Sequence, residues 1–324
     1  MPTPEPIPTR NLGDGGPAVG AIGLGCMGMS WAYGAAERDD DASVRVIHRA
    51  LELGVTLIDT SDVYGPFTNE ELVGRALAGR RDAAVLATKG GLVANLDGPR
   101  PAVERNGRPE HLRAALDASL RRLGTNHVDL YQLHRVDPEV PVEESWGVLA
   151  EAVRAGKARA IGMSEATVDE LERAHAIHPV ASLQSELSLW TRDALGDVLP
   201  WCAAHGAAFI PFAPLGRGFL TGAVSAGSFD DRDFRAGNPR FTREAMDANL
   251  AIVDAVRAVA SRQGAAPGQV ALAWCLAQGE HVVPIPGTKR IAFLEENAAA
   301  AQVELSAEDL AELDALPAPV GSRY

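Results

Sequence analysis

The stretch DASVRVIHRALELGVTLIDTSDVYG, residues 41–65, contains one complete unit of the pattern on which the fold depends. Its first half places Val44, Ile47 and Leu51 on one side of an amphipathic helix, and a single glycine then ends that helix. Its second half begins with a short apolar run at residues 55–59, which has the length and β-branched content of a buried strand. The stretch therefore predicts a helix that leads directly into a strand.

The same alternation continues on both sides of this stretch. Apolar residues at helical spacing, ended by glycine, predict further helices at residues 109–124 and 146–156. Short apolar runs between the helices predict the remaining strands. These runs lie at residues 19–25, 83–88, 127–134, 158–164, 181–186, 207–212 and 281–286.

Eight strands that alternate with helices indicate a parallel sheet covered by helices. Eight units close as a barrel, although the strand number alone leaves an open, doubly wound sheet possible. We therefore expect one α/β domain over residues 1–324, a (β/α)8 TIM barrel with an N-terminal β segment and an extra C-terminal helix at residues 306–316. A long segment at residues 214–242 interrupts the alternation and has the length of a functional loop.

The composition restricts the class of partner. A net charge of -13 and an isoelectric point of about 5.1 argue against nucleic acid or an anionic membrane, since both require a basic face. The sequence shows neither a membrane-spanning run nor a signal-peptide pattern. Cys26, Cys202 and Cys275 lack metal-ligand spacing, so we expect no metal site and free thiols in a reducing cytoplasm. The oligomeric state is left open.

Four chemically active side chains are expected at one rim of the barrel. Active residues of such barrels lie at the carboxyl ends of the strands, where this chain has Asp59, Lys89 and His134. Tyr64 follows Asp59 by five residues. A phenol has a pKa of about 10, and a neighbouring ammonium lowers it by stabilising the phenolate. With Asp59 holding that ammonium and His134 orienting a carbonyl, the group has what is needed to protonate a carbonyl oxygen while hydride reaches the carbon.

Seven segments, in this order, resemble the successive signatures of the aldo-keto reductase family. They are IDTSDVYG (58–65), ATKGG (87–91), LYQLHRVD (130–137), IGMSEA (161–166), SLQSELSLW (182–190), FAPLGRGFL (212–220) and IPGTKR followed by LEEN (285–297). The resemblance covers nearly the whole chain and is specific as a set. It implies that Asp59, Tyr64, Lys89 and His134 are the catalytic tetrad. The segment FRAGNPRF (234–241) is similar to a bacterial and plant branch of the family.

The resemblance also implies a nicotinamide cofactor that lies extended across the rim. Ser164 and Gln184 would hold its carboxamide and Phe212 would stack on its ring, while Glu165 stands where the family often has asparagine. Further expected contacts follow the first, seventh and eighth strands. They are Gly25, Cys26 and Met27; Pro214, Leu215, Gly216, Arg217 and Gly218; and Gly287, Thr288, Lys289 and Arg290, with Glu296 and Asn297 at the adenine.

Two observations bear on the identity of the cofactor. Lys289 and Arg290 stand at the start of a helix, where basic side chains and free N–H groups bind the extra phosphate of NADP(H). The glycines of residues 23–28 formally match the dinucleotide motif G-x-G-x-x-G. No helix follows them directly, and no acidic residue closes a second strand about twenty residues on. We therefore reject a Rossmann interpretation and expect NADP(H).

The resulting hypothesis is an NADPH-dependent aldo-keto reductase of the alcohol dehydrogenase/carbonyl reductase class. It would reduce small-molecule aldehydes or ketones to alcohols, with Tyr64 as the general acid. Aromatic side chains would line an apolar substrate pocket, namely Trp31, Tyr33, Phe67 and Trp190. Two alternatives stay open. One is an NADPH-binding regulatory protein with negligible turnover, like the potassium-channel beta subunits of the family. The other is a lyase that forms a Schiff base at Lys89.

Overall fold

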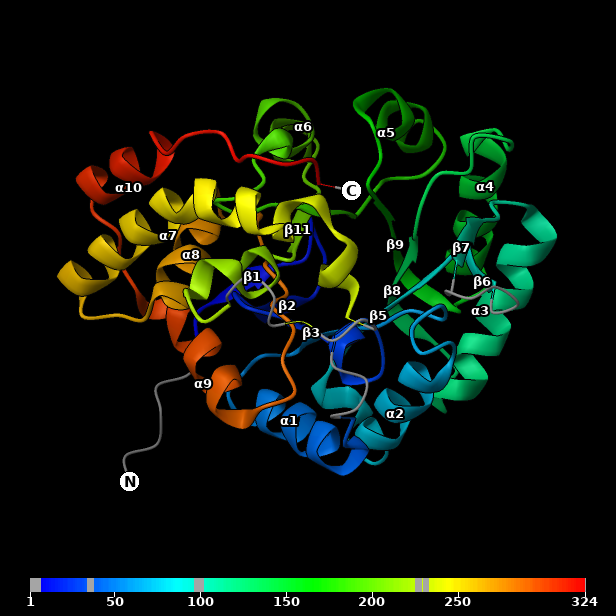
Figure 1. Ribbon diagram of the computed structural model, residues 1–324. Helices are drawn as coiled ribbons and strands as arrows, with labels where there is room; N and C mark the ends of the chain where they lie inside the picture. Colours follow the sequence, from blue (N-terminus) through cyan, green and yellow to red (C-terminus); the bar gives the residue numbers. More distant parts are fainter. Residues whose placement is uncertain (1–6, 34–37, 96–101, 225–228, 230–232, 324) are drawn as a thin grey trace.

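The computed structural model describes residues 7–33, 38–95, 102–224, 229 and 233–323. Within these residues, seven parallel strands form one sheet in the order β11-β10-β9-β8-β5-β4-β3, and helices surround it (Figure 1). The strands are β3 (Leu24–Gly25), β4 (Leu57–Asp59), β5 (Val85–Gly90), β8 (Val128–Leu133), β9 (Ala158–Ser164), β10 (Ser182–Glu186) and β11 (Ala208–Phe212). The expected parallel α/β fold is confirmed.

The segment at residues 281–287 closes this sheet into a barrel. Toward β3, the carbonyl group of Pro284 accepts a hydrogen bond from the N–H group of Gly23 at 2.9 Å. Toward β11, the N–H group of Val283 donates to the carbonyl group of Phe209 at 2.9 Å. Proline has no N–H group, so the prolines of this segment leave the ladder toward β3 incomplete. The expected strand at 281–286 is therefore corrected to an irregular segment that bonds both neighbours, and an open sheet is excluded.

The first expected strand, at residues 19–25, is also wrong as a single element. β1 (Thr9–Asn11) and β2 (Ala18–Gly20) pair as an antiparallel hairpin, and β3 alone enters the barrel. Just beyond β1, the N–H group of Asp14 donates to the carbonyl group of Gly206 at 2.7 Å, near the start of β11. The hairpin thus covers the amino-terminal end of the barrel and leaves the carboxyl end for a site.

The helices follow the glycine and apolar pattern of the sequence. Those around the sheet are α1 (Asp40–Glu52), α2 (Thr68–Leu77), α3 (Pro109–Leu123), α4 (Val142–Arg154), α5 (Val168–His175), α6 (Val198–Ala204), α8 (Pro267–Ala277) and α9 (Ile291–Ala299). Because α1 packs beside both α2 and α9, the ring is closed. Within the described residues, no helix is both long enough and apolar enough to cross a membrane.

Several elements lie outside the simple alternation. The extra C-terminal helix is present as α10 (Ala307–Asp314), which is capped by Ser306 and packs against α7 (Arg243–Gln263). The described residues of the long segment expected at 214–242 include three short turns of 3-10 helix before α7 begins. These turns are η5 (Gly216–Thr221), η6 (Phe234–Gly237) and η7 (Pro239–Phe241). A further hairpin, β6 (Leu92–Asn95) and β7 (Ala102–Arg105), follows β5.

Substitution of two glycines in the helices can show how closely neighbouring helices of this ring pack. A Cβ atom on Gly74 of α2 would lie 2.6 Å from the carbonyl oxygen of Arg122, whereas a Cβ atom on Gly147 of α4 meets no atom within 4 Å. We expect Gly74→Ala to lower the free energy of unfolding by about 1–3 kcal/mol through overpacking. Gly147→Ala, the matched control, is expected to raise it by about 0.4–1 kcal/mol. Urea denaturation of both variants measures the difference, and equal effects would contradict the close packing of α2 on α3.

Candidate active site

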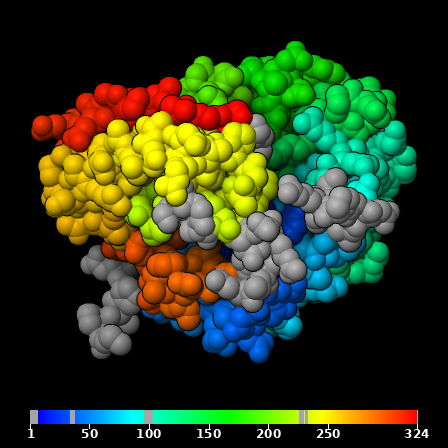
Figure 2. All heavy atoms as spheres, viewed as in Figure 1, coloured from blue at the N-terminus to red at the C-terminus, as the bar shows by residue number. Residues whose placement is uncertain are grey.

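The four residues of the expected tetrad meet at one edge of the sheet. Asp59 ends β4, Lys89 is the penultimate residue of β5, and His134 directly follows β8. Tyr64 lies in the loop between β4 and α2. Because the carboxyl ends of parallel strands share one rim, side chains that are far apart in sequence become neighbours. In the space-filling view, dark-blue atoms from the start of the chain are visible near the centre, deeper than the yellow and cyan segments around them (Figure 2).

Lys89 and Asp59 form a buried ion pair. The Nζ atom of Lys89 donates to Oδ1 of Asp59 at 2.5 Å and to the carbonyl oxygen of Thr60 at 2.9 Å. The other carboxylate oxygen of Asp59 accepts from the side-chain amides of Gln184 at 2.8 Å and of Gln132 at 3.4 Å. Burial lowers the pKa of Lys89, but the charge of Asp59 and the phenol of Tyr64 outweigh it, and the net pKa is raised. Lys89 is therefore an ammonium group.

Tyr64 lies against that ammonium group. Its ring centroid is 5.2 Å from Nζ of Lys89, 5.7 Å from the centroid of His134 and 5.9 Å from that of Trp31. Burial raises the pKa of Tyr64, and the positive charge of Lys89 opposes this effect without cancelling it. The net shift in the pKa of Tyr64 is upward, whereas the neighbouring ammonium alone would lower this pKa. The phenol therefore holds its proton at neutral pH.

His134 is a buried, neutral imidazole. Burial lowers its pKa well below the ordinary value, and the charges of Lys89 and Arg135 lower it further. Its Nδ1 atom lies 3.0 Å from Oγ of Ser61. Ser61 was not among the expected site residues, although it lies in the quoted loop between Asp59 and Tyr64.

The residues expected at the nicotinamide lie on the same rim. Ser164 ends β9, and its hydroxyl group accepts from the guanidinium group of Arg135 at 2.9 Å. Gln184 lies in β10 against Asp59, and the half-buried Phe212 ends β11.

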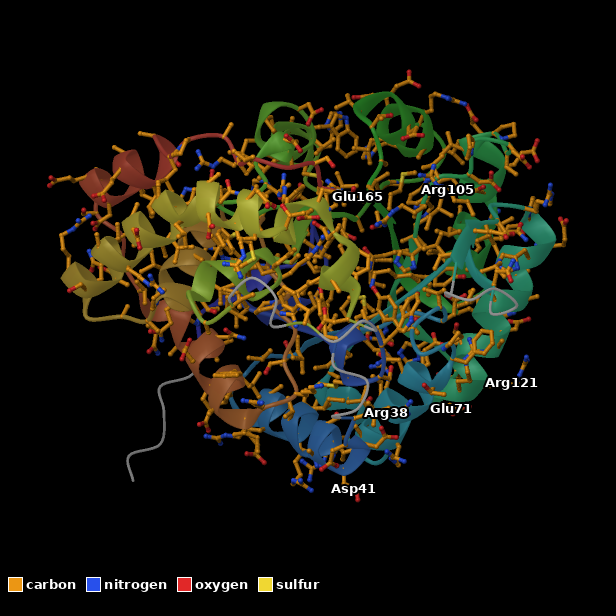
Figure 3. All side chains as sticks on the ribbon, in the orientation of Figure 1. Arg38, Asp41, Glu71, Arg105, Arg121 and Glu165 are labelled. Carbon is orange, nitrogen blue, oxygen red and sulfur yellow. The ribbon has the colours of Figure 1, made fainter. Side chains whose placement is uncertain are left out.

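Glu165, which follows β9, has a positive φ of 55°. Its carboxylate accepts from the N–H group of Glu186 at 2.9 Å and pairs with Arg323 near the C-terminus. In Figure 3, Glu165 lies nearer the centre of the molecule than Arg121 or Asp41.

The segments expected to hold the rest of the cofactor come together at the first and last strands. Gly25 and Gly287 form a parallel bridge, and a Cβ atom on Gly25 would lie 2.8 Å from the carbonyl oxygen of Ile285. Cys26 is buried, with its N–H group bonded to the carbonyl oxygen of Asp59 at 2.9 Å, and Met27 begins the short helix η1 (Met27–Met29).

The residues expected at the phosphate end of the cofactor lie at the start of α9. Arg290 is the N-cap residue of this helix, and its N–H group donates to Oγ1 of Thr288 at 3.1 Å. Lys289, next to it, donates to the carbonyl oxygen of Tyr33 at 3.4 Å. About two turns further along α9, Glu296 is half-buried and Asn297 is buried. A pair of cations thus stands at the N-terminus of a helix, which favours an anion.

The loop after β11 is folded tightly. Pro214 and Gly216 are buried and Leu215 is half-buried, while Arg217 and Gly218 have positive φ values of 56° and 96°. The guanidinium group of Arg217 donates to the carboxylate of Glu186 at 3.1 Å. The arginine expected to contact the cofactor from this loop therefore contacts an acidic side chain of β10.

The structure separates the four aromatic residues expected around the substrate. Trp31 packs against Tyr64, and Tyr33 lies beneath the guanidinium group of Arg235, 5.2 Å from it. Phe67 is half-exposed beside Arg122. Trp190 is 2% exposed and stacks on Phe219 at 4.2 Å, so it lies in the core behind the rim. Of the four, Trp31 is placed best to face a substrate at Tyr64.

Comparisons with known proteins identify the family of the chain. The chain is similar to a glycerol dehydrogenase from Gluconobacter oxydans, with 31% identity, a TM-score of 0.86, and coverage of 95% of this chain and 94% of that one. It is also similar to an aldo/keto reductase from Klebsiella pneumoniae in complex with NADP and acetate, with 28% identity, a TM-score of 0.72, and coverage of 97% and 98%. The model of the Aldo/keto reductase family matches residues 21–318. Since this match spans nearly the whole chain and the fold agrees with it, the chain belongs to the aldo/keto reductase family.

Proposed function

We propose that this protein is an NADPH-dependent oxidoreductase that reduces aldehydes or ketones to alcohols, of the alcohol dehydrogenase/carbonyl reductase class. The observation that carries the proposal is the buried pair of Lys89 and Asp59, 2.5 Å apart, against the ring of Tyr64. A desolvated ion pair is a weak source of stability, because removing the charges from water costs about as much as their attraction returns. Its place beside a phenol at the barrel rim supports a chemical role.

Each side chain of the tetrad has a separate role in the protonation of a carbonyl oxygen. Tyr64 donates its phenolic proton to that oxygen, and the ammonium group of Lys89 stabilises the phenolate that remains. Asp59 keeps Lys89 charged and is itself held by the amide of Gln184. The neutral His134 orients the carbonyl group. When bound, the nicotinamide supplies the hydride that reaches the carbonyl carbon.

The residues present match a nicotinamide dinucleotide. Phe212 offers a half-buried ring for stacking, and the hydroxyl of Ser164 suits a carboxamide. A Cβ atom on Gly25 or Gly287 would meet the backbone of the opposite segment, so these glycines let the first strand and the closing segment pack directly against each other beside the expected cofactor. Lys289 and Arg290 precede a helix of nine residues and would hold the phosphate of NADP. The related structure from Klebsiella pneumoniae contains NADP, which supports this choice.

The two cations at α9 give a prediction about cofactor preference. A charge-assisted contact contributes about 1.5–3 kcal/mol, so Lys289→Ala or Arg290→Ala is expected to weaken NADPH binding about ten- to a hundredfold. NADH lacks the phosphate, so its Kd is expected to change little. Arg121→Ala, on the exposed outer side of α3, is the control for loss of charge alone.

Fluorescence titration of both cofactors measures these changes. Equal weakening of NADH and NADPH would show that the two side chains do not recognise the phosphate. A wild type that prefers NADH would contradict the choice of NADP. NADPH binding is also expected to weaken with ionic strength more steeply than NADH binding.

Turnover separates the proposed enzyme from a regulatory relative of the same fold. The assay follows oxidation of NADPH in the presence of 4-nitrobenzaldehyde and a panel of other carbonyl compounds. We expect NADPH consumption that depends on the carbonyl compound. Tight NADPH binding without turnover across the panel would favour the regulatory protein.

A lyase acting through Lys89 is disfavoured by the same geometry. A Schiff-base lysine must be a neutral amine, whereas Lys89 is fully buried, bonded to Asp59, and has a raised pKa. Borohydride is therefore expected to trap no carbonyl compound on Lys89, which peptide mass analysis would detect.

A further inference from the structure

A chain of hydrogen bonds leads from His134 through Ser61 to the buried carboxyl group of Asp62. Nδ1 of His134 lies 3.0 Å from Oγ of Ser61, and that hydroxyl lies 3.1 Å from Oδ1 of Asp62, placed to donate to it. All three side chains are buried, and Asp62 is 4% exposed. A serine hydroxyl carries one proton, so it can donate to only one of these two neighbours at a time.

The proton on Ser61 therefore couples the other two groups. When Asp62 is a carboxylate, Ser61 donates to it and accepts from Nδ1–H of His134, which leaves a lone pair on Nε2. When Asp62 is protonated, it donates to Ser61, Ser61 donates to Nδ1, and His134 carries its proton on Nε2. The two states differ by one proton. Its uptake at Nε2 is balanced by transfer of the Nδ1 proton to Ser61 and of the hydroxyl proton to Asp62.

We propose that Ser61 and Asp62 are positioning residues that set which ring nitrogen of His134 carries the proton. Asp62 is the buried group that takes up and releases the additional proton. Only the protonated Nε2 can donate a hydrogen bond to a carbonyl oxygen on the far side of the ring from Ser61. The effect on catalysis rests on the proposed carbonyl reduction. The coupling between Asp62 and the tautomer of His134 does not require turnover.

Burial and the charges around Asp62 place its protonation equilibrium near neutral pH. Burial and the carboxylate of Glu70 in α2 raise the pKa of Asp62 to about 7, while Arg122 in α3 and the hydroxyl of Ser61 lower it. Burial, and after it the charge of Asp62, raises the pKa of Tyr131 in β8. A raised pKa means that Asp62 is protonated at more acidic pH and becomes a carboxylate as the pH rises through about 7.

His134 does not take the proton as a cation. Burial lowers its pKa well below the ordinary value, and Lys89 and Arg135 add to that effect. An added proton is therefore stored on Asp62, and the imidazole changes its tautomer while it stays neutral.

NMR of isotopically labelled histidine tests the coupling directly in the full-length wild type. The chemical shifts of the two ring nitrogens of His134 are followed from about pH 5.5 to about pH 9. We expect the Nε2–H form to be replaced by the Nδ1–H form as the pH rises. Asp62→Asn and Ser61→Ala are expected to show one tautomer at every pH. Ser43→Ala, which removes a buried hydroxyl from α1, is expected to behave as the wild type.

The proposal is overturned if the wild type keeps one tautomer throughout, or if Asp62→Asn changes tautomer as the wild type does. The wild-type series alone can contradict it, so a variant that fails to fold does not leave the question open. With an active enzyme, kcat/KM for reduction is expected to fall about tenfold as the pH rises above the titration, because one donor is lost, and Asp62→Asn is expected to lack this fall. Absence of turnover would count against the proposed reaction. The NMR result would still decide whether Asp62 is coupled to the tautomer of His134.

Discussion

Tyr64→Phe is expected to lower kcat by at least about a hundredfold, the usual contribution of a general acid, with little change in the Kd for NADPH. The substitution removes the phenolic oxygen and keeps the ring that packs against Trp31 and His134. Steady-state turnover of an aldehyde and fluorescence titration of NADPH measure the two quantities. Near-full kcat in this variant would exclude Tyr64 as the proton donor.

Tyr131→Phe is the matched control for loss of a buried phenolic hydroxyl. Tyr131 is 1% exposed in β8, and its hydroxyl group is 3.4 Å from the carbonyl oxygen of Leu112 in α3. We expect this variant to lose some stability and to keep most of its kcat, since its hydroxyl faces the helix layer.

Lys89→Met and Lys89→Arg are both expected to lower kcat about a hundredfold or more. Methionine removes the charge that stabilises the phenolate of Tyr64. Arginine keeps a charge, but its planar guanidinium group does not match a fully buried site where one Nζ atom contacts Asp59 at 2.5 Å and the carbonyl oxygen of Thr60 at 2.9 Å. An active arginine variant would show that a nearby positive charge is sufficient.

Stability separates the structural part of this effect from the chemical part. Lys89→Met leaves the carboxylate of Asp59 buried without its cation, which is expected to lower the free energy of unfolding by about 3–5 kcal/mol. The double variant Lys89→Met/Asp59→Asn is expected to recover much of that stability and none of the activity. Recovery of activity in the double variant would contradict the role of Lys89.

The sequence predicted the fold well where one element depends on local chemistry. The helix at residues 41–53 has a clear apolar face and a glycine stop, and α1 agrees with it within one residue at each end. The segments at 19–25 and 281–286 were expected as single strands. Their apolar composition does not reveal that a hairpin caps the barrel or that two prolines interrupt a ladder. Both features depend on which strands become neighbours.

The site was predictable in position more than in detail. Strand ends place Asp59, Lys89 and His134 together in any barrel of this kind, and the structure brings them together. Trp190 was expected at the substrate because aromatic residues often line apolar pockets, but its environment depends on the packing of Phe219 from a distant loop. The sequence did not identify Ser61, because nothing in the sequence shows that its hydroxyl group lies beside Nδ1 of His134.

The most direct test of the proposed reaction follows the hydride itself. The wild-type protein is given an aldehyde and NADPH in which deuterium replaces both hydrogens at the ring carbon that delivers hydride, and the alcohol is examined by mass spectrometry. We expect one deuterium atom on the carbinol carbon of each product molecule, formed with an equal amount of oxidised cofactor. An alcohol without deuterium on that carbon, or no alcohol while NADPH is tightly bound, would contradict the account.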